Sequence, residues 1–180
     1  MQEESIHWVK APSITPTETP TGTPTVETLW RWLEDVPDPE IPVISVVDLG
    51  IVRDVSKRDD LFVVAVTPTY SGCPATRVIS EDIKRHLCSR GVHNVVIEQR
   101  ISPAWTTDWI SADGHEKLRR YGIAPPNKNV STGANGSRII ACPQCDSSNT
   151  ERVSQFGSTP CKASYRCLDC LEPFDYFKCL

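Results

Sequence analysis

The fold is decided by residues 61–74, which read Leu-Phe-Val-Val-Ala-Val-Thr-Pro-Thr-Tyr-Ser-Gly-Cys-Pro. The run over 61–67 is apolar and β-branched, and such a run predicts a buried strand. After the loop 68–73, Pro74 suits the first position of a helix because proline has no N–H to satisfy. One face of that helix carries an apolar side chain at every fourth residue, at Ala75, Ile79, Ile83 and Leu87. The stretch therefore predicts a strand, a loop and a helix that ends at Gly91.

The sequence on either side of this stretch supplies the remaining elements of one domain. In chain order we expect a helix that begins at Thr25 and stops at Pro37, strands over 50–55 and 61–67, a helix over 74–91, a strand over 94–101, and a helical segment over 105–121 that is broken near Ser111. This order predicts an α/β (α+β) domain with a small mixed three-stranded sheet packed by helices.

Composition divides the chain into four parts. Ten of the fifteen residues over 11–25 are Thr or Pro, which predicts a disordered leader. Six of the eight cysteines lie at position 142 or later, as expected for a small module held by a metal. The predicted parts are a leader over 1–25, the α/β domain over 26–122, a linker rich in Pro, Gly, Asn and Ser over 123–137, and a zinc-ribbon module over 138–180.

Two C-x2-C pairs in the C-terminal module predict a metal site. Cys142 and Cys145 form one pair, and Cys167 and Cys170 form the other. Four thiolates from two facing turns make a tetrahedral zinc site that has no open position, so its role is expected to be structural. An iron–sulfur cluster on the same thiolates is the alternative. Two further cysteines, Cys161 and Cys179, are possible alternative ligands.

Charge and hydropathy restrict the partners that the chain can have. The net charge is −4, and residues 138–180 hold five basic and five acidic side chains, so the ribbon lacks the basic surface that nucleic-acid binding requires. No run approaches the roughly 20 apolar residues of a membrane span, and the acidic N-terminus does not read as a secretory signal. We therefore expect a cytoplasmic protein, in which thiols stay reduced and bind metal.

Cys73 is the residue outside the ribbon where chemistry is most readily expected. It lies at the start of a helix, where unpaired backbone N–H groups and the helix dipole stabilise a thiolate, so it could be a nucleophile or a metal ligand. It could equally be a small apolar residue at a tight turn, as we expect for Cys88. Asp38 and Glu40 are candidate acid–base or metal-binding carboxylates, but they could instead be solvated residues that cap a turn.

Several of these residues carry a resemblance to the MIP18 family, whose members assist iron–sulfur protein assembly. The matching residues, over 26 to about 122, are Asp38-Pro39-Glu40, Asp48-Leu49-Gly50-Ile51-Val52, Thr69 and Cys73-Pro74. Two C-terminal segments, 157–163 and 174–179, narrow the resemblance to the family of accessory D subunits of bacterial phenylacetyl-CoA epoxygenase systems. The resemblance implies that Asp38, Glu40, Thr69 and Cys73 line a shared site, with Cys73 as a transient ligand of iron or of an iron–sulfur cluster.

The same resemblance implies a function and a set of partners. The chain would be a non-enzymatic maturation factor for iron or cluster insertion in phenylacetate degradation, and it would have no catalytic residues. Its partners would be the diiron hydroxylase, or the reductase that carries flavin and a [2Fe–2S] cluster. Two alternatives stay open, a docking subunit of the oxygenase and a free-standing thiol enzyme that uses Cys73.

Overall fold

A computed structural model describes residues 24–70, 72–126 and 139–178 of the chain. The predicted leader therefore lies outside the described residues, apart from Pro24 and Thr25, as does the predicted linker from residue 127 onward. The elements of the first part are α1 (Val26–Leu33), β1 (Val52–Arg58), β2 (Leu61–Val66), α2 (Ala75–Ser89), β3 (Val95–Gln99), the short 3-10 helix η1 (Thr107–Trp109) and α3 (Ala112–Arg120).

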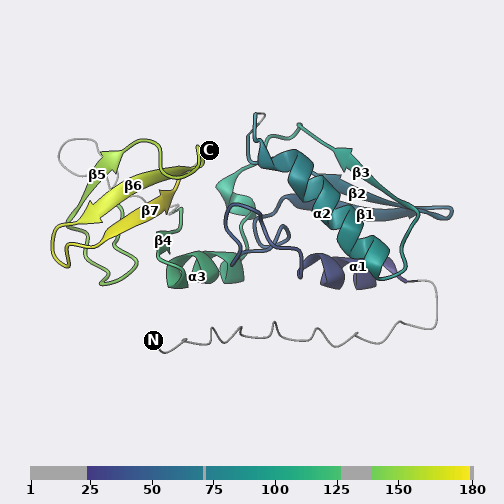
Figure 1. Cartoon of the computed structure of the whole chain (residues 1–180), viewed down its shortest axis with the longest axis horizontal. Helices are drawn as coiled ribbons and strands as arrows, with labels where there is room; N and C mark the ends of the chain where they lie inside the picture. The colour runs from purple at the N-terminus through teal and green to yellow at the C-terminus, as the bar shows by residue number, and fades with distance from the viewer. Residues whose placement is uncertain (1–23, 71, 127–138, 179–180) are drawn as a thin grey trace, which may run out of the picture.

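The first part contains the mixed three-stranded sheet that the sequence predicts. Strand β2 lies in the centre, antiparallel to β1 and parallel to β3. A parallel pair needs a crossover connection, and α2 supplies it between β2 and β3, lying across the sheet in Figure 1. Helix α1 packs against α2 and β1, with Leu29 and Leu33 fully buried. The predicted fold class is confirmed.

The predicted break in the last helical segment is also present. Ser111 caps α3, because its hydroxyl accepts a hydrogen bond from the backbone N–H of Gly114 at 2.9 Å. The residues before it form only the three-residue helix η1. Strand β1 runs further than expected, to Arg58, so the hairpin turn is confined to Asp59 and Asp60, with Asp59 at φ 54°.

The C-terminal part is a four-stranded sheet in the order β4-β7-β6-β5. Its strands are β4 (Ile123–Ala124), β5 (Thr150–Ser154), β6 (Lys162–Cys167) and β7 (Pro173–Phe177). Strand β4 lies within the predicted linker and pairs parallel to β7, so the linker sequence begins with two residues of the ribbon sheet. The strand expected just before Cys142 is absent over 139–141, the described residues there.

The two parts share an apolar contact. Strand β7 ends on the side of the ribbon that faces the first part (Figure 1), and its last residue, Phe177, is 1% exposed. The Phe177 ring lies 6.1 Å from the ring of Trp105, centre to centre. The Trp105 indole N–H donates to the Leu49 carbonyl at 2.9 Å, which places that ring firmly between the parts. The buried core of the first part therefore continues into the ribbon.

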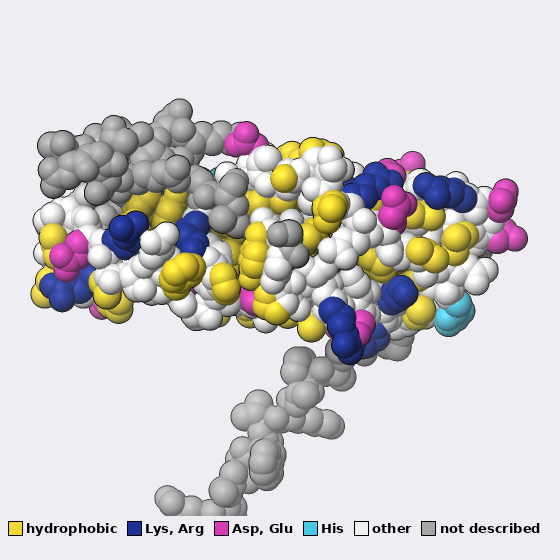
Figure 2. All heavy atoms as spheres, turned by 90° about the horizontal axis from the view of Figure 1, so that it is seen from above, with side chains coloured by type: hydrophobic (Ala, Val, Ile, Leu, Met, Phe, Trp, Pro, Cys, Tyr) yellow, Lys and Arg dark blue, Asp and Glu magenta, His cyan; other side chains and the backbone are white. Residues whose placement is uncertain are grey.

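The surface carries both signs of charge. On the face drawn in Figure 2, basic and acidic side chains lie beside one another, and ion pairs such as Arg90 with Asp35 and Arg119 with Asp146 join them. Within the described ranges, no helix combines the length and the apolar character that a bilayer crossing requires.

Candidate functional site

The four paired cysteines come together as the sequence predicts. The Sγ atoms of Cys142, Cys145, Cys167 and Cys170 all lie within 4.8 Å of one another. Cys142 lies 3.7 Å from Cys170, and Cys145 lies 3.6 Å from Cys167, measured between sulfurs. A tetrahedral ion with metal–sulfur bonds of about 2.3 Å places its sulfurs about 3.8 Å apart. The arrangement therefore fits a tetrahedral metal ion.

Backbone geometry prepares these sulfurs for a metal. Each C-x2-C pair is followed by a residue in the left-handed region, Asp146 at φ 59° and Leu171 at φ 65°, so both turns fold back in the same way. The Cys170 N–H donates to the Cys167 sulfur at 3.5 Å and lowers the pKa of that thiol to about 7. A thiolate is the form that binds metal, so this hydrogen bond favours binding at neutral pH.

A second site lies in the first part, around a cavity. Its lining includes all four residues that the resemblance implied, which are Asp38, Glu40, Thr69 and Cys73. The space that the centre of a water molecule can reach is about 20 Å³, which is room for about one water or one ion. Apolar side chains of the sheet and of α2, among them Ile51, Val66 and Ile79, form its walls.

Asp38 is buried, so it is not a solvated turn residue. Its Oδ1 accepts backbone hydrogen bonds from Glu40 at 2.9 Å and Ile41 at 2.8 Å, which shapes the turn after Pro37. Burial raises the pKa of the Asp38 carboxyl, although the two N–H donors act against the rise. The same turn directs the half-buried Glu40 toward the cavity, where its Oε2 lies 3.8 Å from the sulfur of Cys161.

Cys73 lies at the mouth of α2. Its backbone N–H donates to the Tyr70 carbonyl at 3.1 Å, and its own carbonyl accepts from the Thr76 hydroxyl at 3.0 Å. The cap position of α2 is Pro74, which makes no side-chain capping bond, and the first turn has no acidic residue. The positive end of the helix dipole is therefore left facing the half-buried Cys73 thiol.

Two further residues belong to this site that the sequence did not assign to it. Cys161 lies outside the four-sulfur cluster and lines the cavity beside Glu40. Burial, reinforced by the nearby Glu40 and Asp38 carboxylates, raises the pKa of its thiol. Burial also raises the pKa of Tyr70, and the charges of Cys73, Glu40 and Cys161 raise it further. Cys179, the other proposed alternative ligand, lies outside the described residues.

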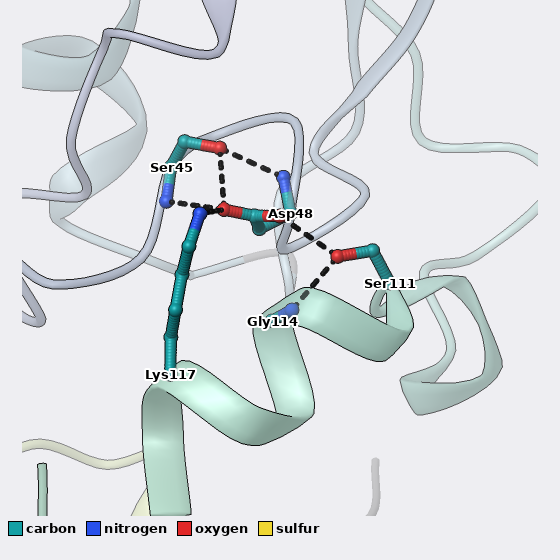
Figure 3. A network of polar contacts seen from close by, with 5 residues as sticks. All are labelled: Ser45, Asp48, Ser111, Gly114 and Lys117. Carbon is teal, nitrogen blue, oxygen red and sulfur yellow. Dashed lines mark hydrogen bonds and ion pairs between the residues drawn. The ribbon is translucent and has the colours of Figure 1, made fainter. Parts of the chain in front are cut away.

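Asp48 does not line the cavity but holds the loop that does. Figure 3 shows its carboxylate between Ser45 and helix α3. Oδ2 accepts from the Ser45 hydroxyl at 2.9 Å and forms an ion pair with Lys117, and Oδ1 accepts from the Ser111 hydroxyl at 2.8 Å. The next residue, Leu49, forms part of the cavity wall. The network therefore fixes the site loop to α3.

Comparison with known families follows the same division into two parts. Residues 27–97 match the family described as "Iron-sulfur cluster assembly protein", and residues 126–178 match the "PaaD zinc beta ribbon domain". The fold and the two sites thus define a class of protein that joins an iron–sulfur assembly domain to a zinc-type ribbon. The MIP18 resemblance is confirmed.

One relative covers nearly the whole of this arrangement. The D subunit named "Putative 1,2-phenylacetyl-CoA epoxidase" in Escherichia coli is 47% identical over 155 residues, which cover 86% of this chain and 93% of that protein. The chain belongs to the family of phenylacetyl-CoA epoxidase D subunits.

Other relatives match the first part alone. The "Fe-S protein maturation auxiliary factor" of Porphyromonas gingivalis is 41% identical over 96 residues, covering 52% of this chain and 90% of that protein. A crystal structure of a DUF59 domain from Bacillus anthracis is 29% identical, with a TM-score of 0.49, and covers 52% of this chain and 90% of that chain.

Proposed function

We propose that this protein is a cytoplasmic accessory factor of a phenylacetyl-CoA epoxidase system in phenylacetate degradation. It assists the insertion of iron or of an iron–sulfur cluster into the diiron hydroxylase or into the flavin and [2Fe–2S] reductase, and it is not itself an enzyme. The family supports the link to an epoxidase, and the maturation factors related to its first part support the link to iron. The observation that carries the proposal is the cavity that gathers Cys73, Asp38, Glu40 and Thr69.

The residues of the cavity suit a cargo that must be held and then released. Cys73 is the acceptor, because a thiol at a helix N-terminus readily supplies a thiolate. Glu40 adds a carboxylate ligand, and Asp38 fixes the position of Glu40 through its bond to the Glu40 N–H. A site of mixed sulfur and oxygen donors binds iron less firmly than four thiolates do, which favours transfer to a client.

The four-cysteine site has a different role in this proposal. Its ligand set leaves no coordination position open for a cargo or a water molecule, so the metal holds the ribbon together. The match to a zinc ribbon family and the tetrahedral sulfur spacing support zinc as that metal. When bound, zinc crosslinks the two turns, and the chain's own residues then present the strands of the ribbon to the first part.

The proposal is tested by replacing Cys73 with serine. Cys88 provides a matched control, because it is a half-buried cysteine on the same helix and lies outside the cavity lining. Each variant is coexpressed with the hydroxylase and the reductase, and iron and acid-labile sulfide are measured in the purified clients. We expect low occupancy with Cys73→Ser, wild-type occupancy with Cys88→Ser, and unchanged zinc in both variants. Full client occupancy with Cys73→Ser would refute the proposed function.

A further inference from the structure

The ribbon contributes a thiol to the cavity of the first part. Cys161, just before β6, lines the cavity together with Cys73 and Glu40, although it lies far from both in sequence. It is 5% exposed and belongs to the buried core of the first part rather than to the core around the four-cysteine cluster. The cavity is thus built by both parts of the chain.

The separation of two donors in the cavity fits a shared metal ion. The Cys161 sulfur lies 3.8 Å from Glu40 Oε2. With metal–sulfur bonds of about 2.3 Å and metal–oxygen bonds of about 2.1 Å, a tetrahedral ion places these two atoms about 3.6 Å apart. A small closure of this pair therefore forms both bonds to one ion. The reachable space of about 20 Å³ admits a single ion more readily than a preformed cluster of irons and sulfides.

The position of Cys161 is firmly fixed by its neighbours in the ribbon. Its carbonyl accepts from the Lys178 N–H at 2.9 Å, and its sulfur lies 3.1 Å from the Thr159 hydroxyl. The next residue, Lys162, is buried and forms an ion pair with Asp175 at 3.2 Å. A donor held in this way loses little freedom when it binds a ligand, which is the usual property of a prepared ligand set.

We infer that Cys161 is a second thiolate ligand for a single ferrous ion, which it holds together with Cys73 and Glu40. This inference rests on the proposed function and specifies its cargo and its ligands. On binding, the two thiols each release a proton to solvent and form a sulfur–iron bond, Glu40 adds a carboxylate oxygen, and iron stays in the +2 state. The ribbon then acts in the transfer site itself, in addition to its structural role.

Cys73 must approach the other two donors when iron binds. Among the described residues, only the four ribbon cysteines form a group of three or more donor atoms within 4.8 Å of one another. Cys73 is half-buried on the loop before α2, and a rotation about its single side-chain torsion moves its sulfur. A ligand that closes on the ion last is also the ligand that can leave first, as delivery to a client requires.

The test counts sulfur ligands on iron in the full-length chain with its ribbon zinc in place. One equivalent of Fe²⁺ is added without oxygen to the wild type and to Cys161→Ser, Cys161→Ala, Cys73→Ser and the control Cys88→Ser. X-ray absorption at the iron edge, which does not detect zinc, reports the sulfurs bound to iron. Equilibrium dialysis gives the Kd for Fe²⁺, and zinc content and Tm report the fold.

We expect two sulfurs on iron in the wild type and in Cys88→Ser. Both Cys161 variants should keep one sulfur and bind Fe²⁺ at least about tenfold more weakly, with zinc retained. One sulfur in the wild type, or four with loss of zinc, would overturn the inference without any variant. Cys161 variants that match Cys88→Ser while Cys73→Ser loses iron would overturn it and leave the proposed function standing. Iron binding unchanged in every variant, with client occupancy also unchanged in Cys73→Ser, would overturn both.

Discussion

At the scale of single residues, the site loop depends on a position that only glycine suits. Gly50 has φ +67°, and a side-chain carbon there would lie 2.5 Å from the Trp109 carbonyl oxygen. Backbone strain and steric overlap therefore act at the same residue. Gly91 has a similar φ of +86°, but a side-chain carbon there would meet no atom within 4 Å. The two glycines separate the cost of conformation from the cost of packing.

We expect Gly50→Ala to lower the free energy of unfolding by about 2–4 kcal/mol, the sum of left-handed strain and overpacking. Gly91→Ala should cost only about 1 kcal/mol, from the strain alone. Urea unfolding followed by circular dichroism measures both values. Equal losses for the two variants would contradict the proposed contact between Gly50 and Trp109.

At the scale of secondary-structure elements, predictability follows the strength of the local pattern. Strand β2 and helix α2 carry an apolar run and a four-residue repeat, and the sequence predicts both to within about two residues. Strand β5, over Thr150–Ser154, is largely exposed and polar and carries no such pattern. Strand β4 has two residues and exists only through its pairing with β7. Elements that depend on a partner strand cannot be predicted from their own sequence.

The link between the site loop and α3 gives a prediction about pH. Burial alone would raise the pKa of Asp48, but the Lys117 ion pair and the hydrogen bonds from Ser111 and Ser45 outweigh burial and hold the pKa below its ordinary value. Ionised Asp48 therefore stabilises the fold at all pH values above its unfolded-state pKa of about 4. This stabilisation is lost as the pH falls through the lower, folded-state pKa.

Asp48→Asn should lower the free energy of unfolding by about 1–3 kcal/mol near neutral pH. The difference from the wild type should shrink as the pH falls below about 4. Asp54→Asn is the control, because Asp54 pairs with Arg100 at 3.6 Å in an exposed position and should change stability by less than about 1 kcal/mol. Urea unfolding at several pH values gives these differences, and a pH-independent loss in Asp48→Asn would contradict the role of its charge.

At the scale of the whole molecule, the candidate site is only partly visible in the sequence. Asp38, Glu40, Thr69 and Cys73 lie on loops around one strand and one helix, and the family pattern alone is enough to group them. Cys161 reaches them through the packing of Phe177 against Trp105, a tertiary contact that leaves no local pattern. Proximity in sequence associates Cys161 with the ribbon metal, whereas the packing of the chain brings it to the cavity instead.

This packing predicts that the ribbon metal supports the distant cavity. The core around the four cysteines is small and includes Cys142 and Cys167 themselves, so removing the metal should unfold the ribbon. Phe177 and Cys161 then leave the core of the first part. Losing a buried aromatic ring costs about 3–5 kcal/mol, so the first part should become less stable while its own sheet and helices persist.

The measurement compares the wild type, Cys142→Ser and Cys88→Ser in thermal unfolding and in Fe²⁺ binding, with and without a strong chelator. Chelation and Cys142→Ser should each lower the Tm of the first part and weaken Fe²⁺ binding, whereas Cys88→Ser should resemble the wild type. Adding back Zn²⁺ after chelation should restore both properties in the wild type but not in Cys142→Ser. A metal-free chain that keeps its full Tm and Fe²⁺ affinity would show that the two parts act independently, because no loss of the ribbon could then reach the cavity.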